Sequence, residues 1–138
     1  MDAVSGSCLC RAVRFKAVLP SKFCSHCHCN NCRRAHGAAF VTWVGFLAGQ
    51  VKVVEGAELL KRYRTDTDAT RSFCSSCGST LFFESERWAG EIHVTRANID
   101  GEIDRSPESN FYVDHSASWW SIDDVLPRYG GESGAERK

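Results

Sequence analysis

Apolar and polar residues alternate in several short stretches of the chain, which is the pattern of strands with one buried face. Near the N-terminus, Val13, Phe15 and Ala17 are separated by the charged residues Arg14 and Lys16. This alternation places apolar side chains on one face and charged side chains on the other. Similar stretches, rich in β-branched and aromatic residues, occupy residues 40–46, 51–55, 59–63, 79–83 and 91–95. We therefore predict a mainly β protein with antiparallel sheets.

Helical patterns are scarce. A short helix is predicted at residues 31–35, directly after the densest group of cysteines, with Gly37 as its C-terminal stop. Residues 100–129 show neither pattern but contain several aromatic residues, including Trp119 and Trp120. Because so many aromatic side chains are unusual in a free tail, we expect this segment to cover another part of the protein.

The length of 138 residues suits one domain with one core, which we place at residues 1–130. The polar, glycine-containing residues 131–138 are expected to form a disordered tail. The first residues lack a signal-peptide pattern, and no window is apolar enough to span a membrane. The expected location is therefore the cytoplasm.

Overall charge gives no sign of a charged partner. Lys plus Arg and Asp plus Glu both number 17. Nucleic-acid binding and binding to an anionic membrane normally require a basic surface, so neither is expected. We predict a small-molecule partner and leave the oligomeric state open.

Eight cysteines in a chain of this length are many. In a reducing compartment, numerous thiols indicate metal binding or catalysis more than disulfides. A secreted disulfide framework would also require a signal peptide, which the sequence does not show. Cysteine spacing therefore carries most of the functional information.

The segment Cys74-x-x-Cys77-Gly78 has the spacing of a zinc knuckle, in which a turn aims two thiolates at one metal ion. Redox proteins share this spacing, but they place it in a βαβ unit that the strand pattern does not provide. Tetrahedral zinc needs a second pair of ligands, which Cys8 and Cys10 can supply. We predict a structural four-cysteine zinc site, the loss of which would unfold the domain.

The central group comprises Cys27, Cys29 and Cys32, three thiols within six residues. This spacing suits one zinc ion and leaves its fourth position undetermined. A zinc ion bound by three thiolates is poorly suited to generating hydroxide, but it can bind an incoming thiol as a thiolate. The expected substrate is therefore a thiol, and these three cysteines form the candidate catalytic site.

Two alternatives for the central group remain open. Cys24, His26, His28 or His36 could fill the fourth position and make a second closed structural site. Cys24 and Cys27 could instead form a redox disulfide pair. Spacing alone does not decide between these alternatives and an open site.

Arg33 and Arg34 directly follow the central group. Guanidinium groups beside an open zinc site could hold the carboxylates of an acidic thiol such as glutathione. Adjacent basic residues on a short helix can equally form a solvated face. His93, in an alternating stretch, is expected to be a structural residue rather than a base.

Several segments together are similar to one known family. They read Gly-Ser-Cys-Leu-Cys from Gly6, Cys-His-Cys-Asn-Asn-Cys-Arg-Arg from Cys27, Arg-Ser-Phe-Cys-Ser-Ser-Cys-Gly-Ser from Arg71, and Leu-Pro-Arg-Tyr from Leu126. This set resembles the glutathione-dependent formaldehyde-activating enzyme family over roughly residues 4–129. Three cysteine groups in this order and spacing make the resemblance specific.

The resemblance implies a β-tent fold, in which small antiparallel sheets are organised around zinc. It also implies two zinc ions, with structural ligands Cys8, Cys10, Cys74 and Cys77 and catalytic ligands Cys27, Cys29 and Cys32. The family's named reaction is that of a carbon-sulfur lyase, which reversibly joins formaldehyde and glutathione into S-(hydroxymethyl)glutathione. Because the family also includes centromere protein V, the alternative is a non-enzymatic binding module with both zinc sites closed.

Two positions depart from the pattern of the resembled family. Cys24 is an additional thiol, and Asn110 stands where a histidine often occurs. The first departure bears on whether the central site is open, and the second on substrate contacts from the later loop. The sequence singles out no proton donor or acceptor among water, His28 and His36.

Overall fold

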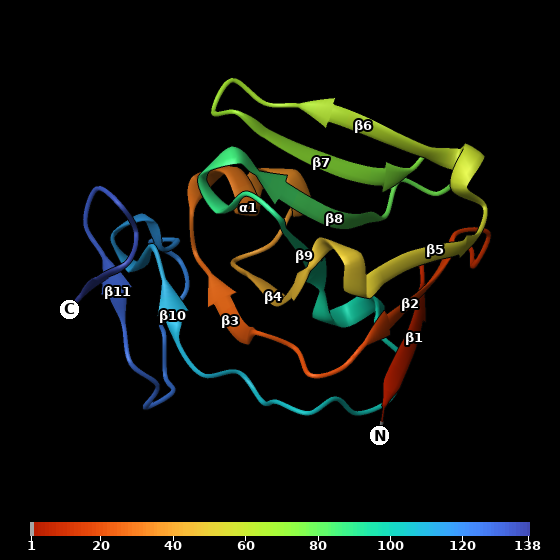
Figure 1. The fold of residues 1–138 in the computed structure, drawn as a ribbon. Coiled ribbons are helices and arrows are strands. Elements are labelled where there is room, and N and C mark those ends of the chain that lie inside the picture. Colours follow the sequence, from red (N-terminus) through yellow and green to blue (C-terminus); the bar gives the residue numbers. More distant parts are fainter. Residues whose placement is uncertain (1) are drawn as a thin grey trace. The chain divides into compact units, whose positions relative to one another are not determined.

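A computed structural model describes residues 2–138. The fold is mainly β and built from small sheets, which confirms the predicted fold class (Figure 1). Most of the strand pairs are antiparallel, whereas Asn110 and Phe111 pair in parallel with His26 and Cys27. The strands are β1 (Ala3–Ser7), β2 (Arg14–Val18), β3 (Phe23–Cys27), β4 (Val41–Leu47), β5 (Val51–Glu55), β6 (Leu60–Arg64), β7 (Ala69–Cys74), β8 (Thr80–Ser85), β9 (Glu91–Thr95), β10 (Asn110–Phe111), β11 (Tyr129–Gly130) and β12 (Glu136–Arg137).

The chain divides into two compact units, each assembled from two separate segments. The first unit comprises Met1–Lys22 and Val44–Asp104, and the second comprises Phe23–Trp43 and Arg105–Lys138. Each unit holds one of the two cysteine groups that could bind a metal ion. The single domain over residues 1–130 stays a prediction.

One sheet of the first unit has the strand order β1-β2-β5. Phe15 and Ala17 on β2 are fully buried, as the alternation predicts. Gly6 on β1 pairs with Phe15. A Cβ at position 6 would lie 2.3 Å from the Phe15 ring and 2.3 Å from the carbonyl oxygen of Asn98, so only glycine fits there.

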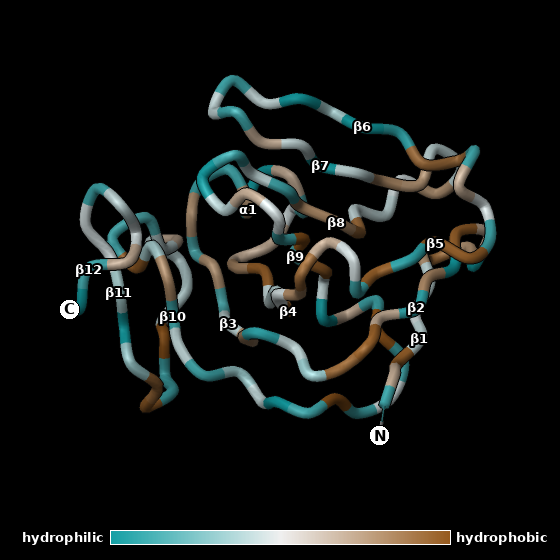
Figure 2. Tube along the Cα trace, in the orientation of Figure 1, coloured by the Kyte–Doolittle hydropathy of each residue, from teal (hydrophilic) through white to brown (hydrophobic). Residues whose placement is uncertain are grey.

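The other sheet of the first unit includes the order β9-β8-β7-β6. Leu81 and Val94 are fully buried, and the ring of Phe82 meets that of Phe15 edge to face with centroids 5.3 Å apart. This contact joins the cores of the two sheets of this unit. β6 is mainly hydrophilic (Figure 2), in agreement with its mostly exposed side chains.

The second unit contains the helix α1 (Asn30–His36), which confirms the short helix predicted around residues 31–35. Gly37 caps the helix in the left-handed conformation, and its N–H donates to the carbonyl of Arg33. No helix among residues 2–138 is long and apolar enough to cross a lipid bilayer. The remaining helical elements are single 3₁₀ turns at Ala48–Gln50, Ala57–Leu59, Glu86–Trp88, Arg96–Asn98 and Val113–His115.

The later part of the chain returns to β3 within the second unit. β10 pairs with β3 in parallel, with Asn110 opposite His26 and Phe111 opposite Cys27. The ring of Phe111 stacks on that of Tyr129, with centroids 4.9 Å apart. Part of the aromatic-rich segment therefore covers the strand that leads into the central cysteine group.

The last residues differ from the disordered tail expected at 131–138. The structure pairs β12 with β11 and places the Arg137 guanidinium over the ring of Tyr129. Asp114 adds a side-chain hydrogen bond by accepting from the N–H of Gly131 at 2.6 Å. The defined structure of these residues comes from backbone pairing and one ring contact. Neither can be recognised in a polar, glycine-containing sequence.

Candidate functional site

Four thiols meet in the first unit, at Cys8, Cys10, Cys74 and Cys77. Their Sγ atoms all lie within 4.8 Å of one another, and each thiol is free of a disulfide. Cys8 and Cys74 are buried, whereas Cys10 is exposed. The structure thus brings together the four residues predicted from their spacing, and we call them the four-thiol cluster.

Two turns present these thiols. Cys74 ends β7, and the turn closes where Gly78, with φ of 83°, donates its N–H to the Cys74 carbonyl at 2.7 Å. The N–H of Leu9 donates to the Ser79 hydroxyl at 2.9 Å and connects the two turns. The same hydroxyl lies 3.2 Å from Sγ of Cys77. This contact, together with backbone hydrogen bonds from Ser79 and Cys10, lowers the pKa of the Cys77 thiol to about 5.

Three thiols meet in the second unit, at Cys27, Cys29 and Cys32. Their Sγ atoms also lie within 4.8 Å of one another. Cys27 ends β3, Cys29 is the N-cap of α1, and Cys32 lies in the first turn of that helix. Sγ of Cys29 accepts a hydrogen bond from the N–H of Cys32 at 3.2 Å, so the thiol itself caps the helix. We call this group the three-thiol cluster.

The chemistry of the three-thiol cluster favours a bound cation. Hydrogen bonds with Cys29 and Cys32, together with burial, raise the pKa of Cys27 well above its usual value. Three adjacent thiolates would repel one another in a buried site. A divalent ion offsets that repulsion, and three or four sulfur ligands are the donor set that zinc prefers. Both clusters therefore fit a zinc ion.

Among residues 2–138, no other Cys, His, Asp or Glu joins the three-thiol cluster within the same distance. Cys24 is fully buried on β3. Nδ1 of His26 lies 2.8 Å from the Thr42 hydroxyl, and the ring of His36 meets the Trp43 ring edge to face. These candidates for a fourth ligand thus make other contacts.

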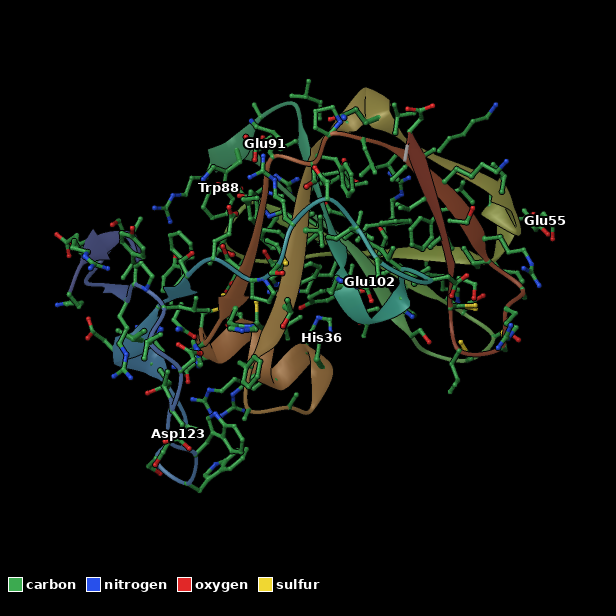
Figure 3. The ribbon with its side chains drawn as sticks, turned by 90° about the horizontal axis from the view of Figure 1, so that it is seen from below. His36, Glu55, Trp88, Glu91, Glu102 and Asp123 are labelled. Carbon is green, nitrogen blue, oxygen red and sulfur yellow. The ribbon has the colours of Figure 1, made fainter. Side chains whose placement is uncertain are left out.

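His36 lies on α1 (Figure 3), on the same helix as the two arginines singled out by the sequence. Arg33 is half-buried and donates to Oδ1 of Asn30, and its Nε is buried with no hydrogen-bond partner among the described residues. Arg34 is exposed. Only Arg33 therefore combines proximity to the cluster with an unused, partly enclosed donor.

Sequence reasoning missed the surroundings of His28. Nε2 of His28 lies 2.8 Å from Oδ1 of Asn110, and Nδ2 of Asn110 donates to Oδ1 of Asp124 at 2.9 Å. Burial lowers the pKa of His28, while Asn110 and Asp124 act in the opposite direction. No spacing rule links residues so far apart in sequence, because the connection depends on β10 pairing with β3.

Two aromatic side chains, Phe40 and Trp120, lie one after the other beside His28. The Phe40 ring lies 5.3 Å from the His28 ring and 6.1 Å from the Trp120 ring, centroid to centroid. Trp120 is 48% exposed and Trp119 is 69% exposed. The aromatic segment thus reaches the neighbourhood of the three-thiol cluster while leaving two indole rings open to solvent.

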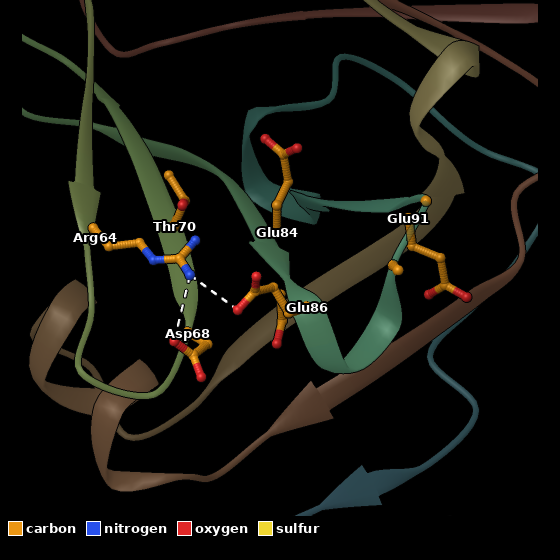
Figure 4. A pocket seen from close by; sticks show the side chains of 9 residues that line it. Arg64, Asp68, Thr70, Glu84, Glu86 and Glu91 are labelled. Atoms are coloured by element: carbon orange, nitrogen blue, oxygen red, sulfur yellow. Dashed lines mark hydrogen bonds and ion pairs between the residues drawn. The ribbon is translucent and has the colours of Figure 1, made fainter.

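A hollow of about 240 Å³ lies elsewhere in the first unit and is lined by no cysteine. Arg64 is paired there with Asp68 and Glu86, and the Glu91 carboxylate points away from this group (Figure 4). This acidic hollow holds no group of side chains arranged to bind a metal ion among the described residues.

Glu91 is bonded to Lys22 and, through Oε1, to Nε2 of His93 at 3.1 Å. His93 is buried, in keeping with the predicted structural role. Burial raises the pKa of Glu91, but the bonds from Lys22 and His93 outweigh it and hold this pKa below its usual value. Glu91 should therefore stabilise the first unit in its ionised form.

Replacing Glu91 with glutamine is expected to lower the free energy of unfolding by about 1 kcal/mol at neutral pH. A carboxyl with a depressed folded pKa contributes fully above its unfolded pKa, and the contribution disappears as pH falls through the folded pKa. Urea unfolding across the acid range should therefore show the two proteins converging. Glu86→Gln is the control, because this side chain is 67% exposed and should matter little. A difference that persists in acid would contradict the assignment.

The chain is similar in sequence to several known proteins. The family model described as glutathione-dependent formaldehyde-activating enzyme matches residues 3–115. A Halomonas elongata protein whose name proposes that same activity is 32% identical over 129 residues, which cover 87% of this chain and 81% of that protein. An uncharacterised lyase of Schizosaccharomyces pombe is 35% identical over 83 residues, covering 60% of this chain and 58% of the relative.

A solved structure agrees with these sequence relatives. The crystal structure of a Rhodobacter sphaeroides protein, a structural-genomics target, superimposes with a TM-score of 0.62 at 31% sequence identity. The match covers 73% of this chain and 92% of the other. The similarity to known proteins therefore extends from the sequence to the fold.

Proposed function

Since the chain belongs to the glutathione-dependent formaldehyde-activating enzyme family, we propose that it is a zinc-dependent carbon-sulfur lyase acting on a thiol adduct. In the adduct-forming direction, the sulfur of glutathione attacks the carbon of formaldehyde. A carbon-sulfur bond forms, the carbon-oxygen π bond breaks, and the thiol proton is balanced by a proton on the new hydroxyl. The reverse direction releases the thiol and the aldehyde. The product is S-(hydroxymethyl)glutathione.

Zinc at the four-thiol cluster would have a structural role, because four cysteines complete a tetrahedral site. Zinc at the three-thiol cluster would have one position left for the substrate. When bound there, it would supply Lewis-acid chemistry that favours the thiolate form of an incoming thiol. Cys27, Cys29 and Cys32 are thus the proposed catalytic-site ligands.

One observation carries the proposal of an open site: the three-thiol cluster has three members among the described residues and not four. A closed site would require a fourth side chain from Cys24, His26, His28 or His36 at the same point. None of these lies within the 4.8 Å that encloses the three sulfur atoms. This favours an enzyme over a binding module with two closed zinc sites.

Arg33 is the proposed partner for a carboxylate of glutathione. Its Nε–H is enclosed and without a partner in the described part of the chain, so an incoming carboxylate would satisfy it. Arg34, which is exposed, would contribute longer-range attraction. Together they would favour an acidic thiol over a neutral one.

The proposed location is the cytoplasm, where reduced glutathione is abundant and cysteines stay free. The proposed organisation is a single zinc domain over residues 1–130, which the family match over residues 3–115 supports. Neither nucleic acid nor a membrane is a proposed partner. The near-neutral charge supports this view.

The function is tested by following adduct formation from glutathione and formaldehyde by NMR exchange spectroscopy, with and without the zinc-loaded protein. We expect the protein to accelerate exchange between free glutathione and its hydroxymethyl adduct. 2-Mercaptoethanol, which lacks carboxylates, should be a poorer substrate, by about tenfold for one lost charged hydrogen bond. Equal exchange rates with and without protein would contradict the proposal.

A further inference from the structure

Asn110 is a buried amide side chain that contacts His28, the residue between Cys27 and Cys29. It is 1% exposed, and both ends of its amide are occupied. Oδ1 lies 2.8 Å from Nε2 of His28, and Nδ2 lies 2.9 Å from Oδ1 of Asp124. Asp124 also accepts from the N–H of Leu126 at 3.0 Å, which fixes the loop before β11.

The carboxylate of Asp124 decides which group donates in each of these hydrogen bonds. An ionised carboxylate can only accept hydrogen bonds, so the amide group of Asn110 that faces it must be the NH₂. The carbonyl oxygen of Asn110 therefore faces His28. Because that oxygen is itself only an acceptor, Nε2 of His28 must carry the hydrogen. In the neutral ring, Nδ1 then bears the lone pair.

Nδ1 of His28 is buried and has no hydrogen-bond partner among residues 2–138. A buried acceptor without a partner costs free energy, so no hydrogen bond at Nδ1 holds the ring in this orientation. The orientation is instead imposed from the other side, by Asn110 and, through it, by Asp124. His28 itself is 1% exposed and has little room to turn.

His28 lies directly between two members of the three-thiol cluster, Cys27 and Cys29. Its own N–H donates to the carbonyl of Phe111 at 2.9 Å. The side chain and the backbone of His28 are thus both hydrogen-bonded to β10. A shift of this ring would move the backbone that presents the two thiols.

From these contacts we infer that Asn110 is a positioning residue of the three-thiol cluster, which it orients through His28. The inference rests on the metal centre of the proposed function, but not on the reaction assigned to it. Loss of a hydrogen bond made directly to a metal ligand commonly weakens metal affinity about 10- to 100-fold. Asn110 acts one step further out, through His28, so we expect the lower end of this range, about tenfold. The loop that carries Asp124 is then coupled to the cluster by two side-chain hydrogen bonds.

The test compares Asn110→Leu, which removes both bonds, with Ser109→Ala as a matched control. Ser109 is the buried neighbour of Asn110, and its hydroxyl lies 2.9 Å from that of Ser25, so this variant also loses one side-chain bond to β3. Zinc affinity is measured by competition with a chelator, with the four-thiol cluster as an internal reference. Asn110→Leu should bind zinc about tenfold more weakly at the three-thiol cluster only. Ser109→Ala should bind it as the parent protein does.

A second measurement separates positioning from simple loss of stability. Nitrogen-15 NMR of the imidazole should show His28 as the single Nε2–H tautomer in the parent protein, and a mixture of tautomers in Asp124→Ala, which removes the acceptor for Asn110. Asp124 is exposed, so this variant should fold even if Asn110→Leu does not. An Nδ1–H tautomer in the parent protein, or unchanged zinc affinity in both Asn110→Leu and Asp124→Ala, would overturn the inference. Neither readout requires catalysis, so failure of the proposed function would be seen separately, in the exchange assay.

Discussion

Replacing Cys27 with serine is expected to remove zinc from the three-thiol cluster and to lower kcat/KM for adduct formation by more than about 100-fold. Two sulfur ligands and a hydroxyl bind zinc far more weakly than three sulfur ligands. Metal analysis should show that the variant retains the ion of the four-thiol cluster alone. Exchange spectroscopy with glutathione and formaldehyde would measure the loss of activity.

Cys24→Ser is the matched control for this prediction. Cys24 is a buried thiol on the same strand, but it stands outside the three-thiol cluster. This variant should keep both metal ions and its activity. If Cys24→Ser loses as much zinc as Cys27→Ser, then Cys24 is a fourth ligand and the site is closed. If Cys27→Ser keeps full activity, the cluster is not the catalytic site.

Replacing Cys74 with serine is expected to destabilise the first unit by more than about 3 kcal/mol and to leave it largely unfolded at physiological temperature. Cys74 is fully buried, ends β7, and belongs to the four-thiol cluster. Metal binding to such a site adds directly to folding free energy, so losing a ligand removes much of that stabilisation. Urea unfolding followed by circular dichroism would measure the change.

Ser76→Ala controls for a change within the same turn, because Ser76 is exposed and lies between the two cysteines of the knuckle. It should unfold at the same urea concentration as the parent protein. Chelation of both metal ions should reproduce the effect of Cys74→Ser. A Cys74→Ser variant as stable as the parent protein would show that the four-thiol cluster has no structural role.

Several strands could be predicted from period-two alternation, which is clearest on β2, where Phe15 and Ala17 are buried between exposed residues. Residues 51–55 and 91–95 are the observed β5 and β9. β3 and β7 were not predicted, because their burial does not follow an alternating apolar pattern. β3 is largely cysteine, histidine and serine near a candidate metal site, and β7 buries the polar residues Arg71 and Ser72. Burial there follows hydrogen bonds and thiol contacts, which hydropathy does not report.

The membership of both cysteine clusters could be predicted because short spacings such as Cys74-x-x-Cys77 restrict where sulfur atoms can meet. The bonds around His28 could not be predicted. Asn110 and Asp124 reach it only because β10 returns parallel to β3, a pairing of two residues with no alternation to reveal it. Spacing therefore identifies ligands, while the side chains that orient them depend on tertiary structure.

The central claim is that the three-thiol cluster holds zinc with one position available to a substrate thiol. Zinc-edge X-ray absorption of the fully loaded protein, recorded during a glutathione titration, tests it most directly. We predict that one of the two zinc environments gains a sulfur neighbour as glutathione binds, and that Cys27→Ser abolishes this change. Two zinc environments that stay unchanged at saturating glutathione would contradict the claim and favour a binding module with two closed sites.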